Sequence, residues 1–256
     1  MNRLHDRVAV VTGGGEGIGR ATCLRLAEEG AAIVVAEINP RTGAAAAEVV
    51  RAAGGRAIFV ETDVSNEKSV QNMVRVAVNE FGKIDILVNN AAIFVLHGIE
   101  ASVEDWRKIL DVNVMGPALV AKHVVPEMKK QGGGAIVNLG SISSFIAQPN
   151  FVTYNATKAA IANMTRCMAL DLAGDNIRVN AVCPGTVWTQ IVERLTKEAG
   201  LSPQEAQTHP DWGGSHMIKR IADPREIANA ILFLASDEAS FITAECLMVD
   251  GGYTAK

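Results

Sequence analysis

Near its start the chain reads VAVVTGGGEGIG over Val8–Gly19. The run Val8–Thr12 is apolar without polar alternation, which predicts a strand buried on both faces of a parallel sheet. Glycines follow with the spacing Gly-x-x-x-Gly-x-Gly, and a helical pattern covers residues 20–29. Glycine lets the backbone approach a diphosphate, and the helix N-terminus behind it supplies N–H donors and the positive end of the helix dipole. The stretch therefore predicts a dinucleotide-binding turn; a P-loop is disfavoured because no Gly-Lys-Ser/Thr follows.

The alternation of strand and helix continues to the end of the chain. Further strands are predicted at Ala32–Glu37, Ala57–Val60, Ile84–Val88, Ala135–Leu139, Ile177–Val182 and Cys246–Val249. Helices are predicted at 40–53, at 66–81, at 103–130 with an irregularity at Gly116-Pro117, through Tyr154 to about 173, and from Pro224, which Asp223 precedes as an N-cap. Only 186–221 fits the alternation poorly. Short connections predict one α/β domain over residues 1–256, a doubly wound parallel sheet with helices on both faces.

Composition excludes several classes of protein. The chain has 256 residues, 48% hydrophobic content and a net charge of -4, so no basic excess indicates a nucleic-acid or anionic-membrane surface. No apolar run reaches the ~20 residues of a membrane span, and no signal core opens the chain, so we expect a cytoplasmic protein. The cysteines are scattered without a CxxC pair and the histidines without ligand spacing: we expect buried reduced thiols at Cys23, Cys167, Cys183 and Cys246 and no metal site.

The end of the second predicted strand carries a clue to the cofactor. Glu37 lies 18 residues beyond Gly19, near the ~20-residue offset at which a carboxylate accepts from the adenosine ribose hydroxyls. A 2′-phosphate would be repelled there, and Glu16 adds a second negative charge. Positions 38 and 39 carry no lysine or arginine, so NAD is favoured over NADP. Arg20 and Arg41 are the side chains that could reverse this preference.

Tyr154 and Lys158 are four residues apart on a predicted helix, which places both side chains on one face. An ammonium beside a phenol favours the phenolate and is expected to lower the pKa of the tyrosine from ~10 toward neutrality. Such a tyrosine can exchange a proton with an alcohol or a carbonyl. Ser141, at the end of the fifth predicted strand, could hydrogen-bond the same oxygen.

Together these residues resemble the short-chain dehydrogenase/reductase family over nearly the whole chain. The motifs that carry the resemblance are the glycine turn 12–19, Asp63-Val64, the Asn-Asn-Ala-Ala run at 89–92, Asn113, Ser141 thirteen residues before Tyr154, Lys158 and Pro184-Gly185. The resemblance implies a Rossmann fold of seven strands, a homotetramer and hydride transfer between a small-molecule alcohol or ketone and a nicotinamide cofactor. Two departures are Ala92, where glycine is more usual, and Gly140, where serine is frequent.

The resemblance also implies roles for individual residues. In the oxidising direction Tyr154 takes the hydroxyl proton, Ser141 bonds the same oxygen, Lys158 holds the nicotinamide ribose hydroxyls, and Asn113 anchors a water that links Lys158 to solvent. Asp63 is implied to meet the adenine amino group, Val64 to pack on the adenine ring, and Asn90 to line the ribose. The full set of implied cofactor-binding residues is Gly13, Gly15, Glu16, Gly17, Ile18, Gly19, Glu37, Ile38, Asp63, Val64, Asn90, Ala91, Tyr154, Lys158, Pro184, Gly185, Val187 and Thr189.

The sequence says less about the identity of the substrate. The family's substrate loop corresponds to about 189–220. The predicted substrate-binding residues are Ser141, Ser143, Gln148, Tyr154 and Trp188, and further candidates by position are Val95, His97 and Phe151. Surface positions are expected for His97, His209 and His216. No lysine or arginine stands at the expected pocket positions, which favours a neutral polyol, sugar, cyclic alcohol or hydroxysteroid. Two alternatives remain open: an NADP(H)-dependent carbonyl or 3-oxoacyl-thioester reductase, and a nucleotide-binding protein without turnover.

Overall fold

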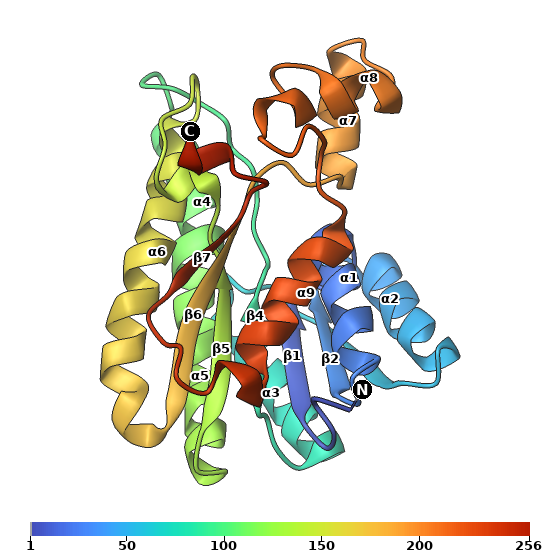
Figure 1. Ribbon diagram of the computed structural model, residues 1–256. Coiled ribbons are helices and arrows are strands. Elements are labelled where there is room, and N and C mark those ends of the chain that lie inside the picture. Colours follow the sequence, from blue (N-terminus) through green and yellow to red (C-terminus); the bar gives the residue numbers. More distant parts are fainter. Residues whose placement is uncertain (1) are drawn as a thin grey trace.

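The computed structural model describes residues 2–256, and its centre is one parallel sheet of seven strands in the order β3-β2-β1-β4-β5-β6-β7 (Figure 1). The strands are β1 Val8–Thr12, β2 Ala32–Glu37, β3 Arg56–Glu61, β4 Ile86–Asn89, β5 Gly134–Leu139, β6 Ile177–Pro184 and β7 Cys246–Val249. Every pairing between neighbours is parallel. The predicted doubly wound Rossmann architecture is confirmed.

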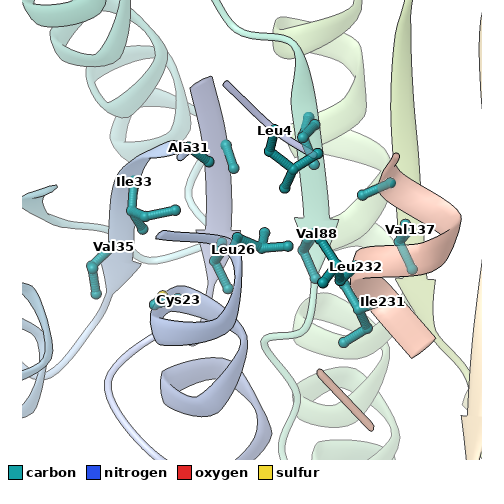
Figure 2. Packing of buried hydrophobic residues seen from close by; sticks show 14 of the residues in the cluster. Leu4, Cys23, Leu26, Ala31, Ile33, Val35, Val88, Val137, Ile231 and Leu232 are labelled. Carbon is teal, nitrogen blue, oxygen red and sulfur yellow. The ribbon is translucent and has the colours of Figure 1, made fainter. Parts of the chain in front are cut away.

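Helices cover both faces of the sheet. Buried side chains of α1 (Gly17–Ala27), α2 (Pro40–Ala52) and α9 (Pro224–Ala235) share one apolar cluster, and those of α3 (Glu67–Phe81), α5 (Gly116–Lys130) and α6 (Val152–Leu172) share the other. The strands serve both clusters because successive side chains point to opposite faces. Figure 2 shows the first cluster, where Leu26 of α1 and Leu232 of α9 meet Val88 and Val137 of the sheet.

The strand order reverses between β1 and β4, which both lie at the centre of the sheet. A parallel sheet forms a crevice outside its carboxyl ends at such a point. The glycine turn follows β1, and the segment 90–102, which holds no helix or strand, follows β4. Helices α7 (Gln190–Glu198) and α8 (Pro203–Thr208) stand above this edge of the sheet in Figure 1. The fold therefore brings its polar loops together at one end.

The predicted elements are present with shifts at their ends. The predicted helix 103–130 consists of α4 (Val103–Leu110), a π-helical turn over Asp111–Met115, and α5. The irregularity therefore comes just before Gly116-Pro117. Pro117 lies within the first turn of α5, where its missing N–H needs no partner, so α5 continues through it. The segment 186–221, which fitted the alternation poorly, forms α7, α8 and a short 3₁₀ turn at Gly213–Ser215.

Two expectations about composition meet the structure differently. Cys23 and Cys183 are buried, but Cys167 is exposed and Cys246 is half-buried, so the expectation of four buried thiols is wrong for Cys167 and Cys246. Cys167 lies on an exposed face of α6, and Cys246 lies in β7, a strand at the edge of the sheet. Across residues 2–256, no helix combines the length and apolar character that crossing a bilayer requires.

Glu29 joins the N-terminal segment to the end of α1. Its carboxylate is buried and accepts hydrogen bonds from the guanidinium groups of Arg3 at 2.8 Å and Arg25 at 2.7 Å. The hydrogen bond from Arg3 is the main reason that the pKa of Glu29 falls from 4.5 to about 2, against the opposing effect of burial. A carboxyl group with a depressed folded pKa stabilises the protein above its unfolded value, and this contribution is lost as the pH falls through the folded value.

We therefore expect Glu29→Gln to lower the free energy of unfolding by about 1–2 kcal/mol near neutral pH, with a deficit that shrinks as the pH falls below about 4.5. Urea unfolding at a series of pH values measures it. Glu238→Gln is the matched control, because Glu238 pairs with the same Arg3 at 3.3 Å but is exposed. A deficit of constant size across the pH range would contradict this account.

Candidate active site

Ser141, Tyr154 and Lys158 meet where β5 ends beside α6. Ser141 is the second residue after β5, and Tyr154 and Lys158 lie one turn apart in α6. All three are nearly buried, and Ser141 hydrogen-bonds the Tyr154 phenol. The Lys158 Nζ donates to Leu139 O at 2.7 Å and lies 5.6 Å from the centre of the Tyr154 ring. The structure thus brings together the three residues that the sequence pattern singled out for proton transfer.

Burial is the largest influence on the pKa values of Tyr154 and Lys158. It raises the pKa of the Tyr154 phenol, and the hydrogen bond with Ser141 offsets only part of that rise. Burial also lowers the pKa of Lys158 to about 8. The expectation that Lys158 lowers the pKa of Tyr154 is not met in the chain by itself, because burial raises that pKa and Lys158 is not among the groups that shift it.

Asn113 lies in the π-helical turn between α4 and α5 and is buried. Its Oδ1 accepts from the Ile93 N–H at 2.8 Å, and its Nδ2 donates to Ile93 O at 2.9 Å and to Thr157 Oγ1 at 3.3 Å. The amide therefore connects the segment after β4 to α6, one residue from Lys158. Single π turns inside helices are frequent at functional sites.

Phe94 was missed by the sequence reading and lies over the reactive phenol. Its ring stacks on that of Tyr154 with centroids 4.7 Å apart and an interplanar angle of 15°, while Phe151 meets Tyr154 edge-on at 6.2 Å. Phe94 remains 42% exposed, so the face turned away from Tyr154 is open to a ligand. Thr153 of α6 secures this segment by donating to Val95 O. No local pattern could reveal Phe94, because the stack joins residues 60 positions apart.

The other substrate candidates lie in different surroundings. Ser143 Oγ donates to Gln148 Oε1 at 2.6 Å, so these two predicted substrate-binding residues bond each other. His97 pairs with Asp105 at 3.0 Å. Trp188 lines a cavity of about 370 Å³ with residues of α1, α7 and the start of α9, and this lining includes none of the other predicted substrate-binding residues. A substrate role for Trp188 stays a prediction.

The glycine turn is held to the end of β4 by two polar side chains. Thr12 Oγ1 accepts from the N–H groups of Asn90 at 3.0 Å and Ala91 at 3.1 Å, and Asn90 Nδ2 donates to Thr12 O at 3.0 Å and Gly13 O at 2.9 Å. Gly13 adopts a φ of 60°, and a Cβ on Gly19 would lie 2.0 Å from Gly13 O. The amide nitrogen of Asn90, implied to line the ribose, is thus used to shape this turn.

The adenosine end carries two carboxylates. Glu37 accepts from the N–H groups of Gly15 and Asn39, both at 3.1 Å, so it lies against the glycine turn. Asp63 accepts from Ser65 Oγ at 2.6 Å. Val64 is buried, whereas Ile38 is 61% exposed. Both charged groups lie at the carboxyl ends of neighbouring strands, as the sequence spacing predicted.

The implied nicotinamide end follows β6. Pro184 ends the strand, and Val187 is buried and bridges to Ala222. Thr189 precedes α7 without its hydroxyl capping that helix, and its side chain faces the glycine turn: a Cβ on Gly17 would lie 3.2 Å from Thr189 Cγ2. The implied nicotinamide end therefore lies next to the glycine turn that is expected to hold the diphosphate.

Comparison with known proteins agrees with this geometry. The family described as enoyl-(acyl carrier protein) reductase matches residues 13–254. A cis-4-hydroxycyclohexanecarboxylate dehydrogenase of Sinomonas cyclohexanicum is 45% identical over 98% of this chain and 97% of its own. A cyclopentanol dehydrogenase of Comamonas sp. (strain NCIMB 9872) is 39% identical over the full length of both chains. A 7α-hydroxysteroid dehydrogenase, solved with NADH and 7-oxoglycochenodeoxycholic acid, superposes with a TM-score of 0.90 at 33% identity, covering 98% of this chain and 95% of that one.

The chain belongs to the short-chain dehydrogenase/reductase family. At the level of class it is an NAD(P)-dependent dehydrogenase that acts on CH–OH groups. The identification explains why Tyr154, Lys158, Ser141 and Asn113 are brought together inside a nucleotide-binding fold.

This short-chain dehydrogenase/reductase has the groups that a dinucleotide needs. Glu16 stands at the N-terminus of α1 without capping it, so the first N–H groups of that helix receive no side-chain cap. The Thr189 hydroxyl leaves α7 uncapped in the same way. Glu37 places a carboxylate where ribose hydroxyls are expected. The donor set therefore fits a nicotinamide dinucleotide along the carboxyl edge of the sheet.

Removing the phenol oxygen tests the proton-transfer role. Tyr154→Phe keeps the ring that packs between Phe94 and Phe151 but leaves no group to exchange a proton, so kcat should fall by roughly 10²–10⁴-fold. The Kd for NADH, measured by fluorescence titration, should stay within about threefold of wild type because the ring packing is retained. Near-wild-type turnover would remove Tyr154 from this role.

Proposed function

We propose that the protein oxidises neutral secondary alcohols on a ring, with NAD as the hydride acceptor. The observation that carries this proposal is the aromatic wall of Phe94 and Phe151 around Tyr154. A flat, partly exposed phenyl ring beside the proton-transfer group offers an apolar face to a carbocycle, while Ser141 and Tyr154 direct hydrogen bonds to one oxygen.

The charges around the site support a neutral substrate. Lys219 donates to Gly214 O at 2.8 Å, Lys256 donates to Ser215 O, and Arg220 makes a bidentate pair with Glu226. His97 pairs with Asp105. Lys219, Lys256 and Arg220 therefore have partners already, so a substrate carboxylate or phosphate would compete with existing bonds.

The relatives support a cyclic substrate by name. Three of the relatives are named for a hydroxycyclohexanecarboxylate, cyclopentanol and a hydroxysteroid, which are all alcohols on saturated rings. The first of these carries a carboxylate, so the preference for a neutral ring in this chain rests on its own charges.

The preference for NAD is supported by Glu37 and by the absence of lysine or arginine at positions 38 and 39. The Glu37 carboxylate lies against Gly15 in the cofactor turn, where a 2′-phosphate would meet a like charge. The solved relative at 33% identity is a complex with NADH, which agrees with this preference.

The chain's own residues then have defined tasks. Tyr154 accepts the alcohol proton at its phenolate oxygen, Ser141 holds the same substrate oxygen, and Lys158 would hold the nicotinamide ribose hydroxyls. Asn113 positions the segment that carries Phe94. The bound nicotinamide supplies the hydride acceptor.

We further propose a homotetramer. Large apolar side chains stand exposed on α4, on the π-helical turn after it and on α6, among them Leu110, Met115 and Leu170. Apolar surface of this kind is usual where copies of a chain associate.

A dehydrogenase assay tests the substrate class. Cyclopentanol and cyclohexanol with NAD should give kcat/KM values roughly tenfold above that of 2-butanol, because the phenyl wall favours a ring, and above that of cis-4-hydroxycyclohexanecarboxylate, because its carboxylate finds no unpaired cation. Phe94→Ala should remove most of the preference over 2-butanol, while Phe241→Ala, a remote exposed phenylalanine, should keep it. Turnover confined to an acyl thioester with NADPH would overturn the proposal.

The cofactor preference has its own test. Glu37→Gln removes the charge that opposes a 2′-phosphate, so the ratio of kcat/KM for NAD over NADP should fall roughly tenfold or more. Glu48→Gln makes the same change of net charge on the outer face of α2 and should leave the ratio unchanged. An unaltered ratio in Glu37→Gln would show that another group selects the cofactor.

A further inference from the structure

His216 lies in the segment that the sequence reading assigned to a surface loop, yet only 2% of it is exposed. It follows the 3₁₀ turn Gly213–Ser215, in the part of the chain between α8 and α9 that stands above the sheet (Figure 1). A buried imidazole needs partners for both ring nitrogens. Its expected surface position is therefore wrong, and its contacts explain why.

The two ring nitrogens bond two different segments. His216 Nε2 accepts from the backbone N–H of Thr186 at 3.1 Å. Because Nε2 is the acceptor, Nδ1 carries the proton of the neutral ring and donates to Gly213 O at 3.2 Å. The imidazole thus joins the turn after β6, where the nicotinamide is proposed to lie, to the 3₁₀ turn of the substrate loop.

The His216 ring is closely packed on two sides. A Cβ on Gly185 would lie 2.6 Å from His216 Nε2, so only glycine lets the ring pack onto the turn. On its other side the ring meets Tyr253 at 5.5 Å, with an interplanar angle of 62°. Ile218 N–H donates to Gly251 O at 3.0 Å, which holds the loop to the C-terminal segment.

Thr186 is held on both sides. Its N–H is bound by His216, and its carbonyl accepts from the Ala222 N–H at 3.0 Å, where the loop returns to α9. Backbone pairing between Thr186 and Ala222 therefore joins the two ends of the loop, and the His216 side chain attaches a point inside the loop to the same turn. Movement of residues 190–215 relative to the turn requires breaking the His216 contact.

We propose that His216 is a positioning residue: it couples the substrate loop 189–220 to the turn Pro184–Thr189 and so sets both the nicotinamide wall and the cover of the substrate pocket. The inference rests on the proposed placement of the nicotinamide against that turn. His216 itself touches neither the proton-transfer group nor the reacting oxygen. Ser141 lies just after β5, and Tyr154 and Lys158 lie in α6, so their geometry does not depend on this contact.

Two variants of similar length separate the hydrogen bond from the packing. His216→Gln keeps an acceptor that can reach the Thr186 N–H, and His216→Met fills similar space without one. In His216→Met we expect the KM values for NAD and for the alcohol to rise roughly tenfold or more, with kcat within about threefold of wild type, because an unpaired buried N–H disfavours the closed loop. His216→Gln should recover most of the loss.

Hydrogen exchange of the peptide that contains Thr186 gives a readout that needs no turnover. The Thr186 amide should exchange roughly tenfold faster in His216→Met than in wild type and His216→Gln. Thermal unfolding of all three proteins shows whether the variants fold. Equal losses in Gln and Met, or a fall in kcat with unchanged KM values, would overturn the positioning role. If no alcohol is oxidised by the wild type but the exchange difference persists, the proposed function fails and the His216 contact stands.

Discussion

The carboxyl ends of β1 and β4 are fastened to each other by Thr12 and Asn90, and the rest of the site depends on that junction. One hydroxyl oxygen receives two backbone N–H groups, and one side-chain amide donates to two carbonyls of the glycine turn. The strand order reverses between β1 and β4, and the sheet's backbone hydrogen bonds stop at the ends of these strands. Side chains satisfy the backbone groups instead, and the crevice they leave can receive a dinucleotide.

From this junction the chemistry is arranged by elements that leave the same edge of the sheet. The segment after β4 carries Phe94 over Tyr154 and is held by Asn113, whose own place in a π-helical turn aims its amide at that segment. The end of β5 carries Ser141, and α6 carries Tyr154 and Lys158. The group is dry enough that burial raises the pKa of the phenol and lowers that of the lysine. A low-dielectric site of this kind makes a nearby charge more effective, since less solvent screens it.

Much of this could be predicted from residue spacing. The seven strands, the glycine turn, Glu37 and the Ser141–Tyr154–Lys158 group follow from patterns that extend over one or two elements, where backbone geometry dictates which side chains share a face. Phe94, the Ser143–Gln148 bond and the burial of His216 could not be predicted in this way. Each depends on contacts between segments whose separation in space is set by packing, and Ser143 and Gln148, close in sequence, meet only because an irregular loop folds back.

The sequence by itself therefore determined the class of fold, the glycine turn and the shared position of Ser141, Tyr154 and Lys158, the residues proposed for proton transfer, because apolar periodicity, glycine conformations and helical spacing are local properties of the chain. The tertiary structure alone decided the protonation tendencies of Tyr154 and Lys158, the aromatic wall beside them and the attachment of the substrate loop through His216. These properties depend on desolvation and on contacts between distant segments, and both arise only when the sheet and its loops have packed together.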